Sequence, residues 1–159
     1  MSVPTLKQAP LQEHTRILGL GAFRPDVIVT NDDVCQWIDS SDEWIRQRTG
    51  IVTRTRAVAE TDAIDLATDA AREAIERSGV AASQVDAVIV ATISNPKQTP
   101  SVSAIVADRV GANPAAAYDV NAACAGFAYG IAQAAEMSKA GAGVAPSRSA
   151  RLAAAEGVA

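Results

Sequence analysis

The sequence has 159 residues, close to the roughly 150 of an average domain, so we expect one domain. Apolar residues make up 48% of it and charged residues 20%, which permits a buried core and excludes an acidic disordered chain. The formal charge of −4 at pH 7 argues against a nucleic-acid binder that works through phosphate contacts. Because aromatic residues account for only 4%, the core must consist mainly of Ala, Val, Ile and Leu.

The sequence predicts neither a membrane segment nor a metal site. No apolar run approaches the roughly 20 residues of a spanning helix, and the N-terminal residues lack the apolar stretch of an export signal. Cys35 and Cys124 are too few for a disulfide framework, so we expect reduced thiols in a cytoplasmic protein. The one histidine, His14, stands apart from the scattered carboxylates, so we expect no metal ion and no permanently bound cofactor.

The first part of the chain predicts short elements. Residues 1–15 are polar, with two prolines, and predict a flexible N-terminal arm. Residues 16–23 alternate apolar and small side chains, which predicts a strand. Thr30 is a candidate N-cap for a short helix that includes Trp37 and Ile38.

The rest of the chain alternates helices and strands. A cap at residues 40–42 opens a second short helix that ends at Gly50, and residues 51–58 predict an edge strand or a loop. Further on, helical spacing alternates with β-branched runs, which is typical of an α/β domain with a largely parallel sheet. We expect helices over residues 62–78, 101–110 and 124–139, and strands over residues 85–93 and 116–121.

Residues 141–159 break this alternation. They consist largely of Ala, Gly, Ser and Arg and contain almost no β-branched residues. The α/β pattern demands a strand after the helix that ends near residue 139, yet these residues do not predict one. We therefore expect a low-complexity, disordered tail.

Cys124 is the first candidate for chemistry. It follows a short predicted strand and opens a long apolar helix, where free backbone amides and the positive end of the helix dipole stabilise a thiolate. The small residues beside it leave room for a substrate. A buried structural cysteine is the competing interpretation, and spacing alone favours it. For Cys35, next to Val34 in an amphipathic helix, a packing role is expected.

Trp44 and Arg48 are the second candidate. They are four positions apart and therefore project from one face of the same helix. An indole beside a guanidinium can stack on a purine and pair with a phosphate, but an ordinary surface cation–π pair has the same spacing. Gly19 and Gly21 begin a G-x-G pattern, but no third glycine or helix follows, so they do not support a dinucleotide site.

Taken together, five stretches resemble the β-ketoacyl-acyl-carrier-protein synthase III family, the initiating condensing enzymes of type II fatty acid synthesis. They are ILGLGAFRP, VTNDDVCQWIDSSDEWIRQRTGI, VDAVIVATISN, QTPSVSAIVADRVG and YDVNAACAGFAYG, in this order. They cover residues 16–140, and the combination of the second with the fifth is specific to the family. The resemblance overturns the interpretation of Cys124 as a structural cysteine.

The resemblance implies a thiolase-like, layered α/β/α fold of two similar halves, with residues 16–140 as the N-terminal domain. It implies that Cys124 attacks an acyl-CoA thioester. The acyl-enzyme then condenses with malonyl carried on acyl carrier protein, with loss of CO₂, in an enzyme that is a homodimer.

The resemblance also assigns binding residues. Trp44 and Arg48 match positions that hold the CoA nucleotide, with Ser40 and Thr49 as weaker neighbours. Thr99 matches the position that borders the acyl channel, and a small threonine there would suit longer acyl primers.

The sequence departs from the family in two ways. The family also uses a histidine and an asparagine from its second half, whereas His14 precedes the first predicted strand. Residues 141–159 do not match the apolar strand that follows the nucleophile helix. We therefore expect an enzyme truncated by a frameshift near codons 138–143 and inactive in condensation.

Two alternatives stay open. One is a non-catalytic remnant or dimer-forming fragment, which the absent half and the apolar faces exposed by it favour. The other is a polyketide-starter condensing enzyme, which uses the same chemistry with another primer.

Overall fold

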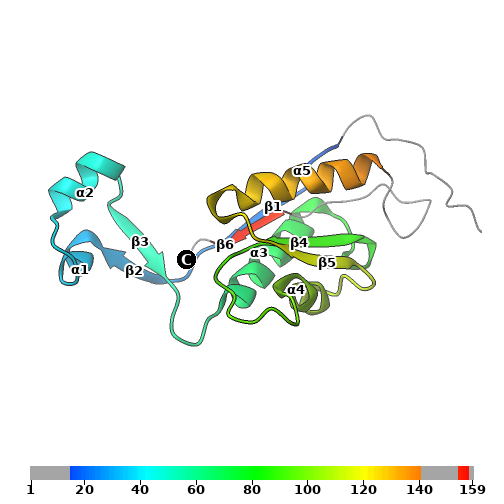
Figure 1. Ribbon diagram of the computed structural model, residues 1–159, viewed down its shortest axis with the longest axis horizontal. Coiled ribbons are helices and arrows are strands. Elements are labelled where there is room, and N and C mark those ends of the chain that lie inside the picture. Colours follow the sequence, from blue (N-terminus) through cyan, green and yellow to red (C-terminus); the bar gives the residue numbers. More distant parts are fainter. Residues whose placement is uncertain (1–14, 141–153, 158–159) are drawn as a thin grey trace, which may run out of the picture.

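The computed structural model describes residues 15–140 and 154–157 (Figure 1). The predicted arm, except for its last residue, and most of the predicted tail lie outside these residues, as does His14. No helix in the described part combines the length and the apolar character that crossing a membrane requires.

The described residues form two parts, which Figure 1 shows side by side. We call residues 26–58 the lobe and the remaining described residues the body. The lobe consists of β2 (Val27–Thr30), α1 (Asn31–Cys35), α2 (Asp42–Thr49) and β3 (Thr53–Arg56). The body consists of β1 (Leu20–Phe23), α3 (Ala63–Ser78), η1 (Ala82–Gln84), β4 (Ala87–Ala91), α4 (Val102–Val110), β5 (Ala116–Val120), η2 (Ala123–Ala125), α5 (Gly126–Lys139) and β6 (Ala154–Gly157).

The body is layered. β4 pairs with β5 and β1 pairs with β6, both in parallel, whereas β2 and β3 of the lobe form an antiparallel pair. α3 and α4 lie on one side of the body strands and α5 on the other (Figure 1). The layered α/β fold expected from the alternation of helices and strands is therefore present.

Four helices begin where polar capping residues predict, and three of them end at a predicted glycine. In α1, Thr30 and Asp33 form a capping box, since Thr30 Oγ1 accepts from the Asp33 amide at 3.2 Å and Asp33 Oδ2 accepts from the Thr30 amide at 2.8 Å. Each of the next three helices starts at a polar N-cap and ends at a glycine with positive φ. These N-caps are Ser41, Asp62 and Ser101, and these glycines are Gly50, Gly79 and Gly111.

The structure corrects four expectations. The first strand covers only Leu20–Phe23 of residues 16–23, and the strand β2 was not predicted. α1 ends at Cys35, so Trp37 lies outside the helix with 85% of its surface exposed. Backbone pairing with β1 forms β6 in the segment expected to be a disordered tail, although the local residues have low strand propensity.

Gly19 and Gly21 have a packing role. A Cβ on Gly21 would lie 2.1 Å from the carbonyl oxygen of Ala70, and one on Gly19 would lie 2.2 Å from that of Ala74. Both carbonyls belong to α3, so this helix packs directly on the backbone of β1 and the segment before it. The G-x-G pattern therefore serves close helix–strand contact.

Small aliphatic residues form the core of the body, as the composition predicts. One cluster centres on Val102, Val106 and Ala71, and a second joins Val85, Ala107 and Ala112. α4 contributes to both clusters, which ties the start of this helix to the sheet beneath it.

Candidate active site

Cys124 lies in η2, the turn between β5 and α5, and its side chain is exposed. Ala123 directly before it has a φ of 45°, a left-handed conformation that costs a residue with a Cβ about 1–2 kcal/mol. α5 starts two residues after Cys124, with no side-chain cap and no acidic residue in its first turn. The Ala125 amide donates to the Ala122 carbonyl at 3.0 Å and the Gly126 amide to the Ala123 carbonyl. The positive end of the helix dipole, rather than these amides, is therefore available to a thiolate or to a developing oxyanion.

Gly126 holds this turn against the sheet. The residue is buried, and a Cβ on it would lie 2.8 Å from the Cβ of Ala91, the last residue of β4. The first turn of α5 can approach β4 this closely only because position 126 has no side chain. Any larger residue would displace the segment that carries Cys124.

The loop of residues 92–101 lies at the same edge of the sheet as Cys124. β4 and β5 are parallel neighbours with Ala91 opposite Val120, and the Thr92 amide donates to the Val120 carbonyl at 3.2 Å. The loop follows the carboxyl end of β4 and the η2 turn follows that of β5, so the two adjoin.

Thr99 is exposed in this loop, before the cis peptide bond to Pro100. A cavity of about 500 Å³ lies behind the loop, and Thr99 is not among its lining residues. Its walls include Pro96, Lys97 and Pro100 of the loop together with Ile64, Leu66 and Ile105.

Trp44 and Arg48 meet on one face of α2, as their spacing predicts. The Arg48 guanidinium carbon lies 5.8 Å from the centre of the Trp44 ring, within cation–π range. Trp44 is 55% exposed, so the pair presents a flat aromatic and cationic surface to solvent. Such a surface fits a purine with attached phosphates, although a surface pair without a ligand has the same geometry.

Ser40 and Thr49 lie at the two ends of α2 and differ in their hydrogen bonding. Ser40 Oγ is buried and has no hydrogen-bond partner among the described residues. Thr49 Oγ1 instead donates to the Ile45 carbonyl at 2.7 Å and accepts from the Ile51 amide at 3.1 Å. Of these two hydroxyls, that of Ser40 lacks a partner, but its burial keeps it out of reach of a ligand.

A polar network, which the sequence did not reveal, holds α2 in place. Asn31 is 1% exposed; its Nδ2 donates to Asp42 Oδ1 at 2.7 Å and to the Ile51 carbonyl at 2.9 Å. Its Oδ1 accepts from Arg54 at 2.6 Å. The Arg46 side chain, and then Asn31, hold the pKa of Asp42 below its ordinary value. Asn31 thus joins the starts of α1 and α2 to β3.

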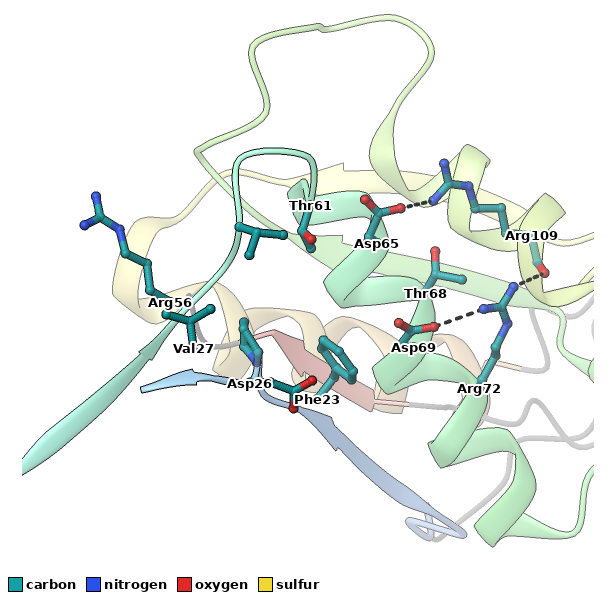
Figure 2. Close-up of a pocket in the computed structure, with 12 residues that line it drawn as sticks. Phe23, Asp26, Val27, Arg56, Thr61, Asp65, Thr68, Asp69, Arg72 and Arg109 are labelled. Atoms are coloured by element: carbon teal, nitrogen blue, oxygen red, sulfur yellow. Dashed lines mark hydrogen bonds and ion pairs between the residues drawn. The ribbon is translucent and has the colours of Figure 1, made fainter. Parts of the chain in front are cut away.

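A second feature that the sequence did not reveal is a pocket of about 570 Å³ where the lobe meets the body (Figure 2). Arg109 pairs with Asp65 at 2.7 Å and Arg72 pairs with Asp69 at 3.0 Å. Arg56 extends away from these pairs. The residues that line the pocket include no cysteine, serine, histidine or lysine, and its helical arginines are already paired with carboxylates, so we assign it no chemistry.

The structure brings some of the predicted residues together and leaves others apart. Cys124 and the loop that carries Thr99 share one edge of the sheet. Figure 1 shows α2, with Trp44 and Arg48, in the lobe and away from that edge, although α5 begins on the side of the body that faces the lobe. No group of described residues has the three or more His, Cys, Asp or Glu side chains of a metal site.

Residues 46–145 match the family described as thiolase, N-terminal domain. The chain belongs to the thiolase family. The matched segment contains Cys124, the loop of residues 92–101 and all of α3, α4 and α5.

Among thiolase-family relatives, this chain is 58% identical over 137 residues to the β-ketoacyl-[acyl-carrier-protein] synthase III of Kocuria rhizophila. The match covers 86% of this chain and 39% of that protein, so the chain spans about two fifths of the length of this relative. The resemblance predicted from the five sequence stretches is confirmed.

Solved thiolase-fold structures agree with this assignment. The priming β-ketosynthase of the R1128 polyketide pathway superimposes with a TM-score of 0.82 at 38% identity, over 88% of this chain and 42% of that one. The 3-oxoacyl-[acyl-carrier-protein] synthase III of Aquifex aeolicus superimposes with a TM-score of 0.77 at 37% identity, over 82% of this chain and 42% of that one.

Proposed function

We propose that this chain provides the acyl-accepting part of a β-ketoacyl-acyl-carrier-protein synthase III, with Cys124 as the nucleophile. One observation carries the proposal. Cys124 is exposed in a turn beside the uncapped start of α5, in a chain similar to synthases of this name. Such a turn offers both an accessible thiol and the positive end of a helix dipole for an oxyanion.

The first step is a thioester exchange. The Cys124 thiolate attacks the carbonyl carbon of an acyl-CoA, and the carbonyl oxygen becomes an oxyanion that the positive end of the α5 dipole stabilises. The bond between the carbonyl carbon and the CoA sulfur then breaks. CoA leaves as a thiolate that takes up the proton released from Cys124, and the acyl group remains on the enzyme as a thioester.

The lobe would hold the nucleotide end of CoA. The Trp44 ring offers a stacking face for the adenine, and the Arg48 guanidinium offers a partner for the phosphates. Ser40 and Thr49 would support this surface from the two ends of the helix, since the Ser40 hydroxyl is buried and the Thr49 hydroxyl bonds to the helix backbone. Because CoA is long and flexible, its thioester can reach Cys124 while its nucleotide stays on the lobe.

The second step joins the acyl group to malonyl-acyl carrier protein with release of CO₂. In the family this step uses a histidine and an asparagine from the second half. Residues 16–140 contain no histidine, and none of their asparagines matches that position. We therefore propose self-acylation as the reaction of these residues, and condensation as a reaction that requires those further groups. We also propose that the protein is a homodimer in the cytoplasm. In this dimer, Thr99 would lie beside an acyl channel suited to longer primers.

Self-acylation is the direct test. The chain is incubated with acyl-CoA, and the added mass is located by peptide mapping. We expect the acyl group on Cys124 and none on the Cys124→Ala variant, while the matched Cys35→Ala variant is acylated at the wild-type rate. Acylation that persists in Cys124→Ala would remove the nucleophile assignment.

Priming of a polyketide is a second candidate, which the structural similarity to the R1128 priming β-ketosynthase favours. The acylation step is the same in both roles, so Cys124 keeps its part. The genes beside this one distinguish the two roles.

A further inference from the structure

Asp119 joins the end of β5 to the start of α4. Its Oδ2 accepts from the Val102 amide and its Oδ1 from the Ser103 amide, each at 2.9 Å. Both amides lie in the first turn of α4, and both residues are fully buried. Each carboxylate oxygen therefore satisfies an amide that has no partner within its own helix.

The cap that Asp119 provides differs from the local cap of the same helix. Ser101 Oγ accepts from the Ala104 amide at 3.2 Å, three residues along the chain. Asp119 reaches the same turn from 16 and 17 residues away. Its negative charge also complements the helix dipole, so the carboxylate holds α4 in a set position on the sheet.

The two segments that Asp119 connects carry the candidate site. Asp119 comes five residues before Cys124, and Val102 comes three residues after Thr99. Val120, which follows Asp119, holds the other end of the Thr99 loop. The Val120 carbonyl accepts a hydrogen bond from the Thr92 amide at 3.2 Å. Both ends of the loop are thus anchored on Asp119 and Val120, the last two residues of β5.

We propose that Asp119 is a positioning residue: it sets the position of the Thr99 loop relative to Cys124 and thereby selects the length of the acyl chain that reaches the thiol. This inference rests on the function proposed above. A change at Asp119 should shift the preference among acyl-CoA substrates, because it moves the loop that flanks the thiol and leaves the thiol itself exposed.

The test compares Asp119→Asn with Asp108→Asn, which removes the same charge from the exposed C-terminal end of α4. Acylation of Cys124 by acetyl-CoA and by dodecanoyl-CoA is followed by intact mass, and alkylation by iodoacetamide reports thiol access alone. We expect Asp119→Asn to change the ratio of the two acylation rates about tenfold, with little change in alkylation. Asp108→Asn should leave the ratio at its wild-type value.

An unchanged ratio in a folded Asp119→Asn variant would overturn the proposal, as would equal slowing of both acylations and of alkylation. If Asp119→Asn does not fold, Asp119→Glu takes its place, since the longer side chain keeps the charge and shifts α4.

If the wild-type chain accepts no acyl group, the proposed function fails, and hydrogen exchange decides this inference. Faster exchange across residues 92–103 in Asp119→Asn, and not in Asp108→Asn, would support the link. Unchanged exchange would refute it.

Discussion

In the body, α3 and α4 bury small aliphatic side chains against each other and against the strands, with Val102 and Val106 almost completely inaccessible. In the lobe, only Asn31 and Ile45 are buried, and the elements are joined by the hydrogen bonds of Asn31, Asp42 and Arg54. Apolar packing has no directional requirement, whereas each bond of a buried polar network depends on a particular partner. The body should therefore tolerate loss of charge and the lobe should not.

The aromatic residues allow the two parts to be monitored separately. Both tryptophans, Trp37 and Trp44, lie in the lobe, and both tyrosines, Tyr118 and Tyr129, lie in the body. Tryptophan emission consequently reports on the lobe, and tyrosine ellipticity in the near ultraviolet reports on the body.

The largest expected effect is that of Gly21→Ala in the body. The new Cβ would lie 2.1 Å from a backbone oxygen of α3, so the helix has to move away from β1. We expect a loss of about 3 kcal/mol or more in the free energy of unfolding, measured by urea titration of the tyrosine signal. Leu20→Ala, a change at a 57% exposed neighbour, is the control. Equal stability of the two variants would contradict the close helix–strand contact.

Asn31→Ala should cost the lobe about 2 kcal/mol, because it removes a buried side chain and leaves part-buried polar groups of Ile51 and Arg54 without this partner. The tryptophan transition in urea should move to lower concentration while the tyrosine transition stays in place. Asp32→Ala, at the exposed next position of α1, serves as the control. A joint shift of both transitions would show that lobe and body unfold as one unit.

Acid should weaken the lobe more than the body. In the lobe, hydrogen bonds from Thr30 lower the pKa of Asp33, and Arg46 and Asn31 lower that of Asp42, both from an ordinary 3.8. In the much larger body, the pKa of Asp65 is lowered by the Asp62 amide and by Arg109. A lowered folded pKa adds stability that is complete above the unfolded value and is lost as the pH falls through the folded value. Tryptophan emission should therefore change more than the tyrosine signal below about pH 4. In Asp42→Asn this difference between the two signals should shrink, and an unaltered difference would argue against the network.

The smallest effect on stability is expected for Arg48→Ala, about 0.5 kcal/mol, since an exposed cation–π pair contributes little. The same variant should weaken CoA binding, followed by quenching of tryptophan emission. Arg48→Lys keeps the charge but loses the planar group. Its affinity for CoA should therefore lie between that of the wild-type protein and that of Arg48→Ala. Identical CoA affinity in all three proteins would remove Arg48 from the nucleotide site.

The helix boundaries were predictable because capping is local. Thr30, Ser41 and Asp62 each bond to amides two or three residues ahead, so the residues that decide where these helices start stand together in the sequence. The four-residue spacing of Trp44 and Arg48 predicted their contact in the same way. Five family-like stretches likewise predicted the family to which the chain belongs.

The interactions that were missed are those made over long separations in the chain. Asn31 binds groups 11 to 23 residues away, and Asp119 binds amides 16 and 17 residues away; no local pattern marks either residue. β2 was missed because it is four residues long and mostly exposed, so it has no alternation of buried and exposed positions. β6 forms through backbone pairing with β1, and the composition of a segment does not indicate such pairing.

The direct contact between α3 and the backbone near β1 restricts which inherited changes this gene can accept. At Gly19 and Gly21 every single-base missense change adds at least one carbon atom where α3 carbonyls already stand. The intervening Leu20 is largely exposed and is free of this restriction. A variant at either glycine codon would thus reduce the amount of folded protein in the cell without touching the reactive sulfur.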